Sequence, residues 1–296
     1  MIEFLALETD SGTRLDVFLA NKLSDYSRSV IKKLCDSGDV LVNKEVQKTK
    51  YKVRIGDHIA VMIDLKSLQE IPDISLDIIF EDADCLVINK PAGVLTHSKG
   101  AFNPEATVAT FIKSKTERMG GDRSGIVHRL DRATSGVIIC AKNPETLAWF
   151  QKQFSQRKVK KTYYAIVLGH MNPQEAVIDI PIERHPRNPK TFRASPSGKT
   201  AQTHYKVVGA SADYQLLELK PTTGRTHQLR VHLKYLKHPI LGDTIYGGQS
   251  AGRMYLHASD LELTLPNKQR KTFHVDVPES FQAIIDNNGT LTSPAN

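Results

Sequence analysis

One weakly patterned stretch divides this chain and constrains its fold more than any other feature. Residues 65–77 show neither helical nor alternating hydrophobic spacing, and they contain Pro72. Regular apolar patterns lie on both sides of it. The chain has 296 residues, enough for about two domains. We therefore predict a small domain over 12–64, a linker over 65–77, a larger domain over 78–286 and a flexible tail over 287–296.

The small domain is predicted to contain two short helices, over 15–23 and 28–36, followed by short strands. In the second helix, Arg28, Lys32 and Lys33 lie on a face other than the apolar one, because residues three or four apart are neighbours on a helix. Such a helix can pack one face on a core and turn its basic face toward phosphate groups.

The larger domain alternates strand-like and helix-like segments. Short apolar runs predict strands over 78–80, 85–88, 136–140, 163–168 and 214–219. Asn143 followed by Pro144 is typical of a helix start. The spacing of leucines after Thr226 predicts a helix over 226–236.

The positive charge of the chain is concentrated in one stretch. The formal net charge is +8, and residues 151–206 hold 11 basic residues against 3 acidic ones. A concentrated basic stretch suits contact with phosphate groups better than an even distribution does. Composition alone leaves an ordinary solvated surface equally open.

Several common kinds of site are absent from the sequence. There is no phosphate-binding GxxxxGK[ST] loop, no GxGxxG, no GxSxG and no HExxH. His227 and His232 do not form a recognisable zinc pattern. We therefore expect neither a cofactor nor a metal. The three cysteines lack a CxxC pair and are expected as buried thiols in the cytoplasm. No apolar run is long enough to predict a membrane span.

Two polar clusters remain as candidates for chemistry. The first, 125–136, joins Asp131 to two arginines and a histidine, and the second, 223–232, contains Arg225. A carboxylate near a guanidinium stays ionised, and in a shielded pocket it can act as a nucleophile. Chemistry alone leaves open that Asp131 caps a turn and that Arg225 merely pairs with it.

The segment His128-Arg-Leu-Asp-Arg-Ala-Thr-Ser-Gly136 resembles the signature of the Rlu-type RNA pseudouridine synthases. Companion segments agree in order and spacing: Asn89–Gly93, Lys161–Ala165, Thr223–His232 and His238–Asp243. The first domain is similar to an S4 RNA-binding domain. The resemblance implies an α+β fold, in which the S4-like module precedes a catalytic domain with a mixed, mainly antiparallel central sheet flanked by helices.

The resemblance also implies an activity. These enzymes isomerise uridine to pseudouridine in structured RNA after flipping the base out, and an S4-like module favours large-subunit (23S) ribosomal RNA as the substrate. Two alternatives remain open: a transfer RNA pseudouridine synthase, and a non-catalytic RNA-binding or ribosome-assembly factor on the same fold. We expect a cytoplasmic monomer that needs no membrane and has structured RNA as its partner.

The resemblance assigns roles to five residues. Asp131 matches the essential aspartate, and Arg129 matches an arginine that enters the RNA helix as the target base leaves. Tyr163 matches the tyrosine that stacks on the flipped base and is a candidate for proton abstraction. Arg225 matches the basic residue paired with the aspartate, and Leu229 matches an apolar residue of the pocket wall.

Two basic surfaces are predicted to contact RNA outside the pocket. The first is the second helix of the small domain, with Arg28, Lys32 and Lys33. The second is a rim beside the pocket, formed by Lys158, Lys160, Arg187 and Arg193. The remaining signature residues, such as His128 and Ser135, are expected to fix the Asp131 loop by hydrogen bonds, and Lys90 is expected to be structural.

Overall fold

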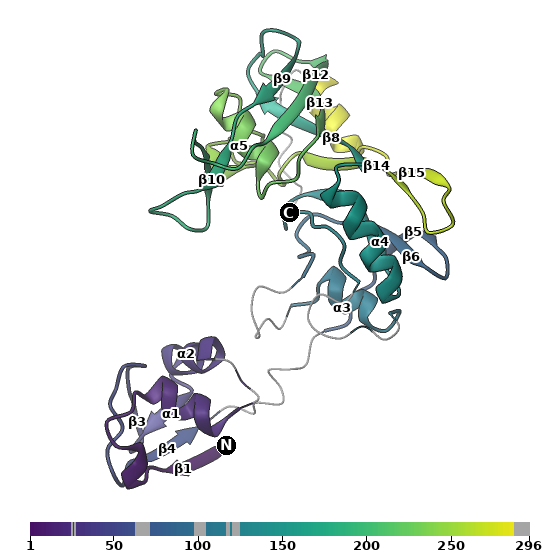
Figure 1. The fold of residues 1–296 in the computed structure, drawn as a ribbon. Coiled ribbons are helices and arrows are strands. Elements are labelled where there is room, and N and C mark those ends of the chain that lie inside the picture. Colours follow the sequence, from purple (N-terminus) through teal and green to yellow (C-terminus); the bar gives the residue numbers. More distant parts are fainter. Residues whose placement is uncertain are drawn as a thin grey trace. The chain divides into compact units, whose positions relative to one another are not determined.

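The structure is a computed structural model that describes residues 1–24, 26, 28–62, 72–97, 105–116, 119 and 125–286. It divides into two compact units: Met1–Ile74 with His97–Thr110, and Ser75–Thr96 with Phe111–Asn296 (Figure 1). The boundary after Ile74 falls inside the predicted linker. Residues 97–110, which the prediction gave to the larger domain, are grouped with the first unit. The predicted tail, 287–296, and linker residues 65–71 lie outside the described residues.

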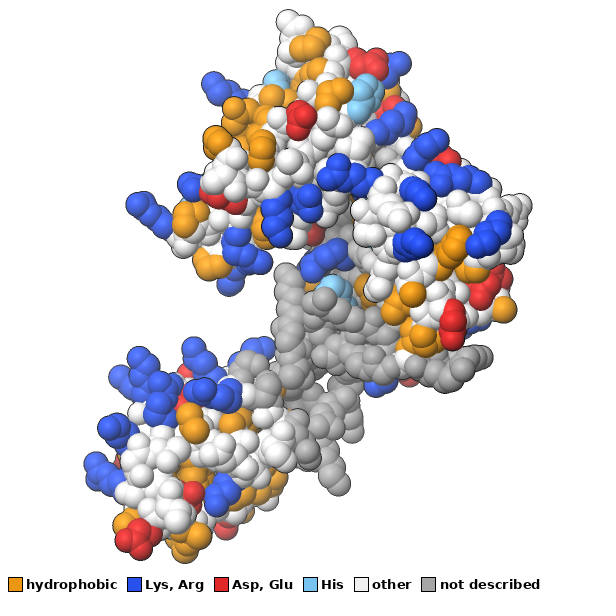
Figure 2. Space-filling model, in the orientation of Figure 1, with side chains coloured by type: hydrophobic (Ala, Val, Ile, Leu, Met, Phe, Trp, Pro, Cys, Tyr) orange, Lys and Arg blue, Asp and Glu red, His pale blue; other side chains and the backbone are white. Residues whose placement is uncertain are grey.

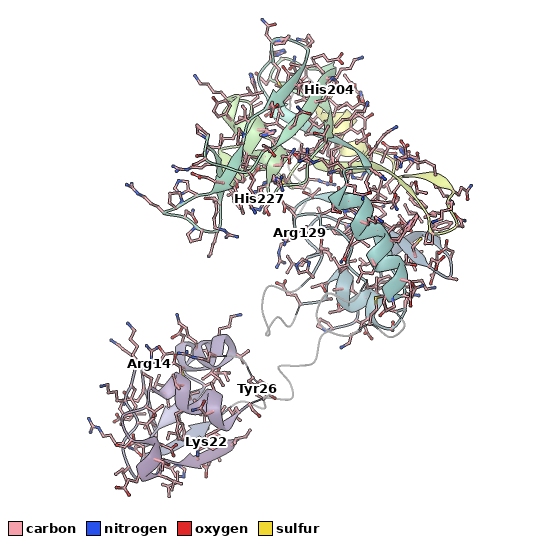
Figure 3. All side chains as sticks on the ribbon, viewed as in Figure 1. Arg14, Lys22, Tyr26, Arg129, His204 and His227 are labelled. Carbon is pink, nitrogen blue, oxygen red and sulfur yellow. The ribbon has the colours of Figure 1, made fainter. Side chains whose placement is uncertain are left out.

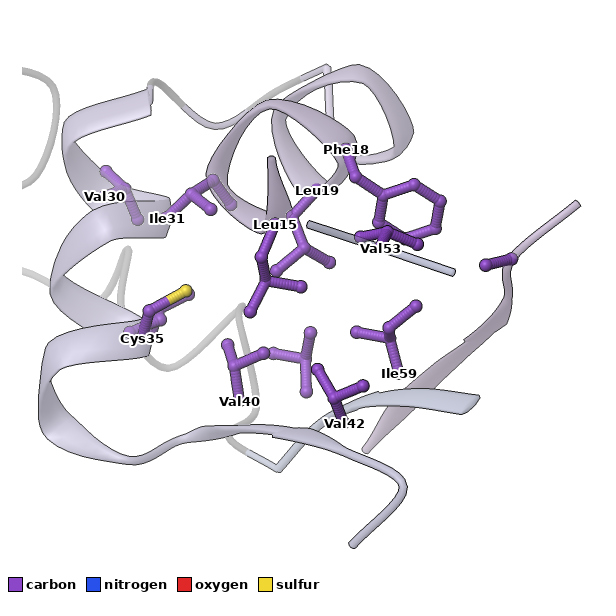
Figure 4. Packing of buried hydrophobic residues seen from close by; sticks show 13 residues of the cluster. Leu15, Phe18, Leu19, Val30, Ile31, Cys35, Val40, Val42, Val53 and Ile59 are labelled. Atoms are coloured by element: carbon purple, nitrogen blue, oxygen red, sulfur yellow. The ribbon is translucent and has the colours of Figure 1, made fainter. Parts of the chain in front are cut away.

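The N-terminal unit is built on a small antiparallel sheet. Its elements are β1 (Ile2–Leu5), η1 (Glu8–Asp10), α1 (Leu15–Lys22), α2 (Arg28–Ser37), β2 (Val40–Val42), β3 (Glu45–Val46) and β4 (His58–Val61). The strand order is β1-β4-β2-β3. Leu15 and Leu19 of α1, Ile31 of α2 and Ile59 of β4 are fully buried against one another (Figure 4). This shared core explains why the apolar spacing of the two helices could be read from the sequence.

The second unit is organised around a nine-stranded sheet. Its strands are β5 (Asp77–Glu81), β6 (Cys85–Lys90), β7 (Ser135–Ala141), β8 (Lys160–Leu168), β9 (Glu175–Asp179), β12 (Gln202–Ala210), β13 (Tyr214–Pro221), β14 (Leu256–Thr264) and β15 (Arg270–His274). The order is β5-β6-β7-β14-β8-β13-β12-β9, and β15 pairs with β14. Among the described strands, only the β7–β14 pairing is parallel, so the predicted mixed, mainly antiparallel sheet is confirmed.

Helices and a separate hairpin complete this unit. The helices are α3 (Val108–Lys113), α4 (Pro144–Ser155), α5 (Gln228–Tyr235), η3 (Thr244–Tyr246) and α6 (Glu279–Asp286). The hairpin joins β10 (Ile182–Arg184) to β11 (Phe192–Ala194). α4 packs on β7, α5 on β11 and α6 on β13 (Figure 1). The fold class is therefore α+β, as predicted. Within the described ranges, no helix has the length and apolar character needed to cross a membrane.

The parallel pairing of β7 with β14 depends on a glycine at the end of the signature. Gly136 has φ 113°, and a Cβ atom there would lie 2.0 Å from the carbonyl oxygen of Ala258 on β14. No other residue could bring the two backbones this close without displacing one of them. Since β7, β14, β8 and β13 are neighbours, the loops at their ends converge, and Asp131 and Tyr163 come from this centre of the sheet.

The helix starts are set by local backbone chemistry. The side chain of Asn143 accepts a hydrogen bond from the Thr146 N–H, 2.8 Å away, and Pro144 is the first residue of α4, as predicted. α5 begins at Gln228, two residues after the predicted start. His227 has φ 56° and ψ 21°, a left-handed conformation that cannot continue a right-handed helix. The helix therefore starts only after it.

Candidate active site

A cavity of about 310 Å³ opens within the second unit. Three segments line it: the signature loop from Val127 to Thr134, the strand β8 through Lys161 and Tyr163, and the segment from Pro221 to Arg230. Arg129 and His227, which both line this cavity, are labelled close together in Figure 3. The sheet thus brings together the signature and its companion segments.

A buried lysine holds the signature loop by hydrogen bonds to backbone carbonyl oxygens. The Lys90 Nζ donates to the carbonyl oxygens of Pro91, Val94 and Arg132 at 2.9, 2.8 and 3.3 Å. Burial lowers the pKa of Lys90 to about 7. Its contacts tie the loop around Asp131 to the end of β6, which agrees with the structural role expected for Lys90.

Two further signature residues are held by hydrogen bonds. The ring nitrogen Nε2 of His128 accepts from the Ile139 N–H at 3.1 Å, and the ring stacks on Phe154. Burial lowers the pKa of His128 to about 3, so the ring is neutral. The Ser135 hydroxyl lies 2.8 Å from His257 Nδ1. Both contacts fix the loop in front of β7 and leave the chemistry to other residues.

Asp131 presents one oxygen to its protein partners and keeps the other for the cavity. Arg230 Nη1 lies 3.3 Å from Oδ2, and His227 Nε2 lies 3.7 Å from the same oxygen. Among the residues that the structure describes, no hydrogen-bond donor contacts Oδ1. The side chain is 17% exposed. A carboxylate held through one oxygen and open at the other can bond to a ligand in the cavity.

Arg230 is the guanidinium that holds this carboxylate. It is buried, and its Nε and Nη2 atoms donate to the two oxygens of Asp243, each at 2.7 Å. Its guanidinium also lies over the ring of Tyr246. Burial alone would lower the pKa of Arg230, but the hydrogen bonds and charges of Asp243 and Asp131 outweigh burial and raise it. Arg230 is therefore a fixed cation between two carboxylates.

The predicted pairing of Arg225 with Asp131 is wrong. Arg225 lines the cavity, but its Nε donates to the carbonyl oxygen of Thr200 at 2.9 Å. Its backbone N–H donates to Gln228 Oε1 at 3.0 Å, which closes a loop before α5. Because the helix begins only after His227, Arg225 stays in this loop. Arg230, in the first turn of the helix, reaches the carboxylate instead.

Sequence reasoning missed Arg230, His227 and a third residue, Lys161. Lys161 Nζ donates to the carbonyl oxygen of Thr223 at 2.9 Å, and burial lowers its pKa to about 8. Signals for these residues were present, since all three lie within the companion segments. Arg230 also lies on the same side of α5 as Leu233, roughly 60° away around the helix, which indicates a buried and therefore paired charge.

The predicted aromatic and apolar residues lie at the cavity. Tyr163 projects from β8, and Leu229 of α5 is 7% exposed in the core cluster next to it. Burial, and then the charge of Asp131, raises the pKa of Tyr163. Its hydroxyl therefore keeps its proton at neutral pH. Arg129 is exposed and lines the cavity.

The cavity suits an anionic ligand better than a metal. Arg129, Lys161, Arg225 and Arg230 all line it, and together they can attract a phosphate-bearing molecule. Within the described part of the chain, no three His, Cys, Asp or Glu side chains gather in a way that could hold a metal ion.

The basic face of α2 lies where the sequence predicts it. Arg28, Lys32 and Lys33 are exposed, whereas Ile31 and its apolar neighbours are buried. Figure 2 shows Lys and Arg side chains gathered over this helix. Arg28 has an additional role, because its Nη2 lies 3.1 Å from Oδ2 of Asp16.

The predicted rim divides into two kinds of residue. Lys158, Lys160, Arg187 and Arg193 are all exposed. Lys160 Nζ lies 3.4 Å from a carboxylate oxygen of Glu262, and Arg193 Nη2 lies 2.7 Å from one of Glu183. Acidic neighbours therefore offset part of the charge that composition assigned to this surface.

Comparisons with known proteins identify the family. Residues 84–235 match the family described as RNA pseudouridylate synthase, and residues 13–59 match the S4 domain. A relative from Borreliella burgdorferi, named ribosomal large subunit pseudouridine synthase D, is 37% identical over 94% of this chain and 90% of its own length. The synthase D of Escherichia coli strain K12 is 35% identical over 94% of this chain and 91% of its own length.

Solved structures agree with these relatives. The structure of human RNA pseudouridylate synthase domain containing 1 is 29% identical, with a TM-score of 0.59 over 73% of this chain and 89% of that one. The structure of human RNA pseudouridylate synthase domain containing 4 is 26% identical, with a TM-score of 0.57 over 78% of this chain and 97% of that one. Sequence and fold thus agree, and this chain, which also carries an S4 domain, belongs to the RNA pseudouridylate synthase family.

Proposed function

We propose that this chain converts uridine to pseudouridine in large-subunit ribosomal RNA and that Asp131 is its nucleophile. The observation that carries the proposal is the one-sided hold on Asp131, with Arg230 and His227 at Oδ2 and Oδ1 left to the cavity. The choice of RNA rests on relatives that are 35–37% identical over 94% of this chain and carry the large-subunit name.

The target uridine first has to leave its helix. Flipping a base out of a stack costs a few kcal/mol, and stacking on an aromatic ring offsets about 1–3 kcal/mol of that cost. Tyr163 lines the cavity as such a platform, and Leu229 forms the apolar wall beside it. Arg129 is exposed at the same cavity and is proposed to fill the space that the base vacates.

The chemistry needs no change in oxidation state. Oδ1 of Asp131 attacks C1′ of the nucleotide and bonds to it as the N1–C1′ bond breaks, and the uracil keeps the electron pair of that bond on N1. The uracil then turns, C5 forms a bond to C1′ and the carboxylate leaves. The proton on C5 is lost and N1 gains one, so atoms and electrons balance. Lys161 and Arg230 supply positive charge around the departing uracil anion.

Contacts outside the cavity are proposed to hold the RNA in place. The exposed Arg28, Lys32 and Lys33 of α2 form one contact, and the rim with Lys158 and Arg187 forms another. Because such contacts neutralise phosphates, they strengthen binding without reading sequence.

We further propose that the chain acts as a monomer in the cytoplasm. The signature loop, β8 and the segment before α5 meet within one unit to form the cavity, so the proposal needs no residue from a second copy. Cys35, Cys85 and Cys140 are free and buried, which is typical of a protein kept in a reducing compartment.

The test is a map of pseudouridines in total RNA. Cells with the native gene are compared with cells that lack it and with cells that carry only Asp131→Asn. We expect one or more large-subunit positions to lose pseudouridine in the deletion and to stay unmodified with Asp131→Asn. A matched control, Asp213→Asn, replaces an exposed carboxylate outside the cavity and should restore modification.

Each contrary result identifies what is wrong. If pseudouridine is lost only from transfer RNA, the proposed substrate is wrong. If Asp131→Asn restores the large-subunit positions, the role of Asp131 is wrong. If no position changes in the deletion, the proposed activity is wrong.

A further inference from the structure

His227 makes contacts that its place in a recognised motif does not explain. Its Nδ1 lies 2.7 Å from the hydroxyl oxygen of Tyr246, and its Nε2 lies 3.7 Å from Oδ2 of Asp131. The ring therefore bridges a tyrosine of η3 and the candidate nucleophile. Its backbone is in the left-handed region, with φ 56°, which is unfavourable for a residue with a side chain. Such strain is often kept at functional positions.

The hydroxyl of Tyr246 is placed to set which nitrogen of His227 carries a proton. This tyrosine is 2% exposed, and its oxygen accepts a hydrogen bond from the Phe192 N–H at 2.9 Å. The hydroxyl proton is then free to be donated to Nδ1 of His227, 2.7 Å away. A neutral ring that accepts at Nδ1 carries its own proton on Nε2. The Nε2–H group faces Oδ2 of Asp131.

Two aromatic rings hold the imidazole in this orientation. The ring of Tyr246 lies edge-on to that of His227 with 5.6 Å between centroids, and the ring of Phe192 does so at 5.4 Å. The guanidinium of Arg230 lies over the ring of Tyr246, 4.8 Å from its centroid. Tyr246 thus contacts both groups that approach Oδ2.

We propose that Tyr246 and His227 are positioning residues that set the orientation of the Asp131 carboxylate. The Tyr246 hydroxyl orients the His227 ring, and the ring and Arg230 together restrain Oδ2. Rotation of the carboxylate is then restricted, so that Oδ1 stays directed at the nucleotide. This inference rests on the proposed role of Asp131 and adds the groups that make that role effective.

The same contacts connect the carboxylate to the RNA-facing surface. Phe192 begins β11, and the hairpin of β10 and β11 carries the exposed Arg184 and Arg187. The guanidinium of Arg184 lies 5.0 Å from the centroid of the Phe192 ring. The hairpin backbone, Tyr246, His227 and Asp131 therefore form one continuous chain of contacts. RNA bound at the hairpin and the Asp131 carboxylate are thus both in contact with this chain of residues.

The first test is Tyr246→Phe, which removes one oxygen and keeps the ring. We expect the single-turnover rate constant with ribosomal RNA to fall by about 10-fold, the effect of one lost hydrogen bond, while RNA affinity stays unchanged. The matched control is Tyr205→Phe. That tyrosine is 3% exposed and its hydroxyl donates to the Pro173 carbonyl oxygen at 2.8 Å, away from the cavity, so its rate should equal that of the native chain.

The second test separates the two nitrogens of His227. In His227→Gln the side-chain amide can place a donor near the position of Nε2, whereas in His227→Asn it reaches only the position of Nδ1. Asparagine also tolerates the left-handed backbone better than other side chains do. We therefore expect both variants to fold and His227→Gln to retain more of the rate. Equal rates for the two variants, or a faster Asn variant, would overturn the proposal.

A third readout does not depend on turnover. Nitrogen-15 NMR of the imidazole rings in the native chain should show His227 protonated at Nε2, and in Tyr246→Phe a mixture of the two neutral forms. A ring protonated mainly at Nδ1 in the native chain would overturn the assignment of the hydrogen bonds.

The native chain and Asp131→Asn are measured beside these variants. If Asp131→Asn turns over as fast as the native chain, the proposed function fails and this inference fails with it. If Asp131→Asn is inactive but Tyr246→Phe has the native rate, the proposed function stands and this inference alone is overturned.

Discussion

The carboxylates of Asp16 and Asp131 are each held by two basic side chains. They differ in which of their oxygen atoms these side chains contact. In the N-terminal unit, Arg14 bonds both oxygens of Asp16 at 2.9 and 3.0 Å, and Arg28 adds a contact to Oδ2 at 3.1 Å. In the catalytic unit, the contacts of Arg230 and His227 with Asp131 are made at Oδ2, at 3.3 and 3.7 Å.

This difference separates a structural ion pair from a reactive one. Asp16 is 7% exposed and its two oxygens are both occupied, so it can only support the fold. Asp131 lines a cavity and retains an oxygen for a ligand. Pairing with arginine is thus common to both and marks neither as functional. The useful marker is an unoccupied oxygen at a cavity.

The largest effect is expected from breaking the hold on Asp131. Arg230→Ala leaves Asp131 and the buried Asp243 without their shared cation. Removing one partner of a buried pair costs about 3–5 kcal/mol of unfolding free energy, and turnover should fall with it. Chemical denaturation and single-turnover kinetics measure the two effects. Arg225→Ala removes a contact to a backbone carbonyl oxygen, and it should lower both the unfolding free energy and the turnover rate far less.

Arg230→Lys keeps this comparison testable if the alanine variant does not fold. A lysine retains the charge but cannot bond both oxygens of Asp243 and also reach Asp131. We expect a folded protein with a reduced rate. The pairing account is contradicted if Arg225→Ala slows the reaction at saturating RNA more than Arg230→Lys does.

A smaller effect is expected from the structural carboxylate. Burial alone would raise the pKa of Asp16, but hydrogen bonds and charges from Arg14 and Arg28 lower it overall. Because the folded-state pKa lies below the unfolded one, about 3.9, the stabilisation is fully present above that pH. It is lost as the pH falls through the folded value. Asp16→Asn should remove this dependence and cost about 1 kcal/mol.

Hydrogen exchange of the α1 and β4 amides in the intact chain, between about pH 3 and 6, measures this effect. Turnover at saturating RNA serves as the control, and it should not change. A native-like exchange profile in Asp16→Asn, or a slowed reaction, would remove the distinction between the two carboxylates.

The smallest effect is expected at the rim. Each phosphate contact contributes about 0.7–0.9 to the slope of log affinity against log salt. Replacing Lys158 and Arg187 by glutamine should lower that slope by about 1.5. Replacing Lys160 and Arg193, which have glutamate neighbours, should lower it by less. Equal slopes for the two double variants would show that the acidic neighbours do not matter.

The sequence predicted the helices of the first unit and the motifs that carry Asp131, Tyr163 and Leu229 to the cavity, because each depends on local spacing or on a contiguous motif. The partner of Asp131 could not be predicted in this way. Arg225 and Arg230 stand in one motif, and only the left-handed backbone of His227 decides which of them the helix turns inward.

The rim shows a second limit of sequence reasoning. Glu262 lies opposite Lys160 because β14 pairs with β8, and Glu183 lies opposite Arg193 because β10 pairs with β11. These partners are set by strand register. Composition counts the basic residues of a segment and takes no account of acidic residues brought in by a neighbouring strand.

The most direct test of the account is the reaction of Asp131→Asn with large-subunit ribosomal RNA labelled with tritium at C5 of uridine. Release of tritium reports loss of the C5 proton, and a binding assay on the same RNA reports affinity. The account predicts that release falls to background, by about 10³-fold or more, with affinity and unfolding free energy close to those of the native chain. Tritium release at the native rate would contradict it.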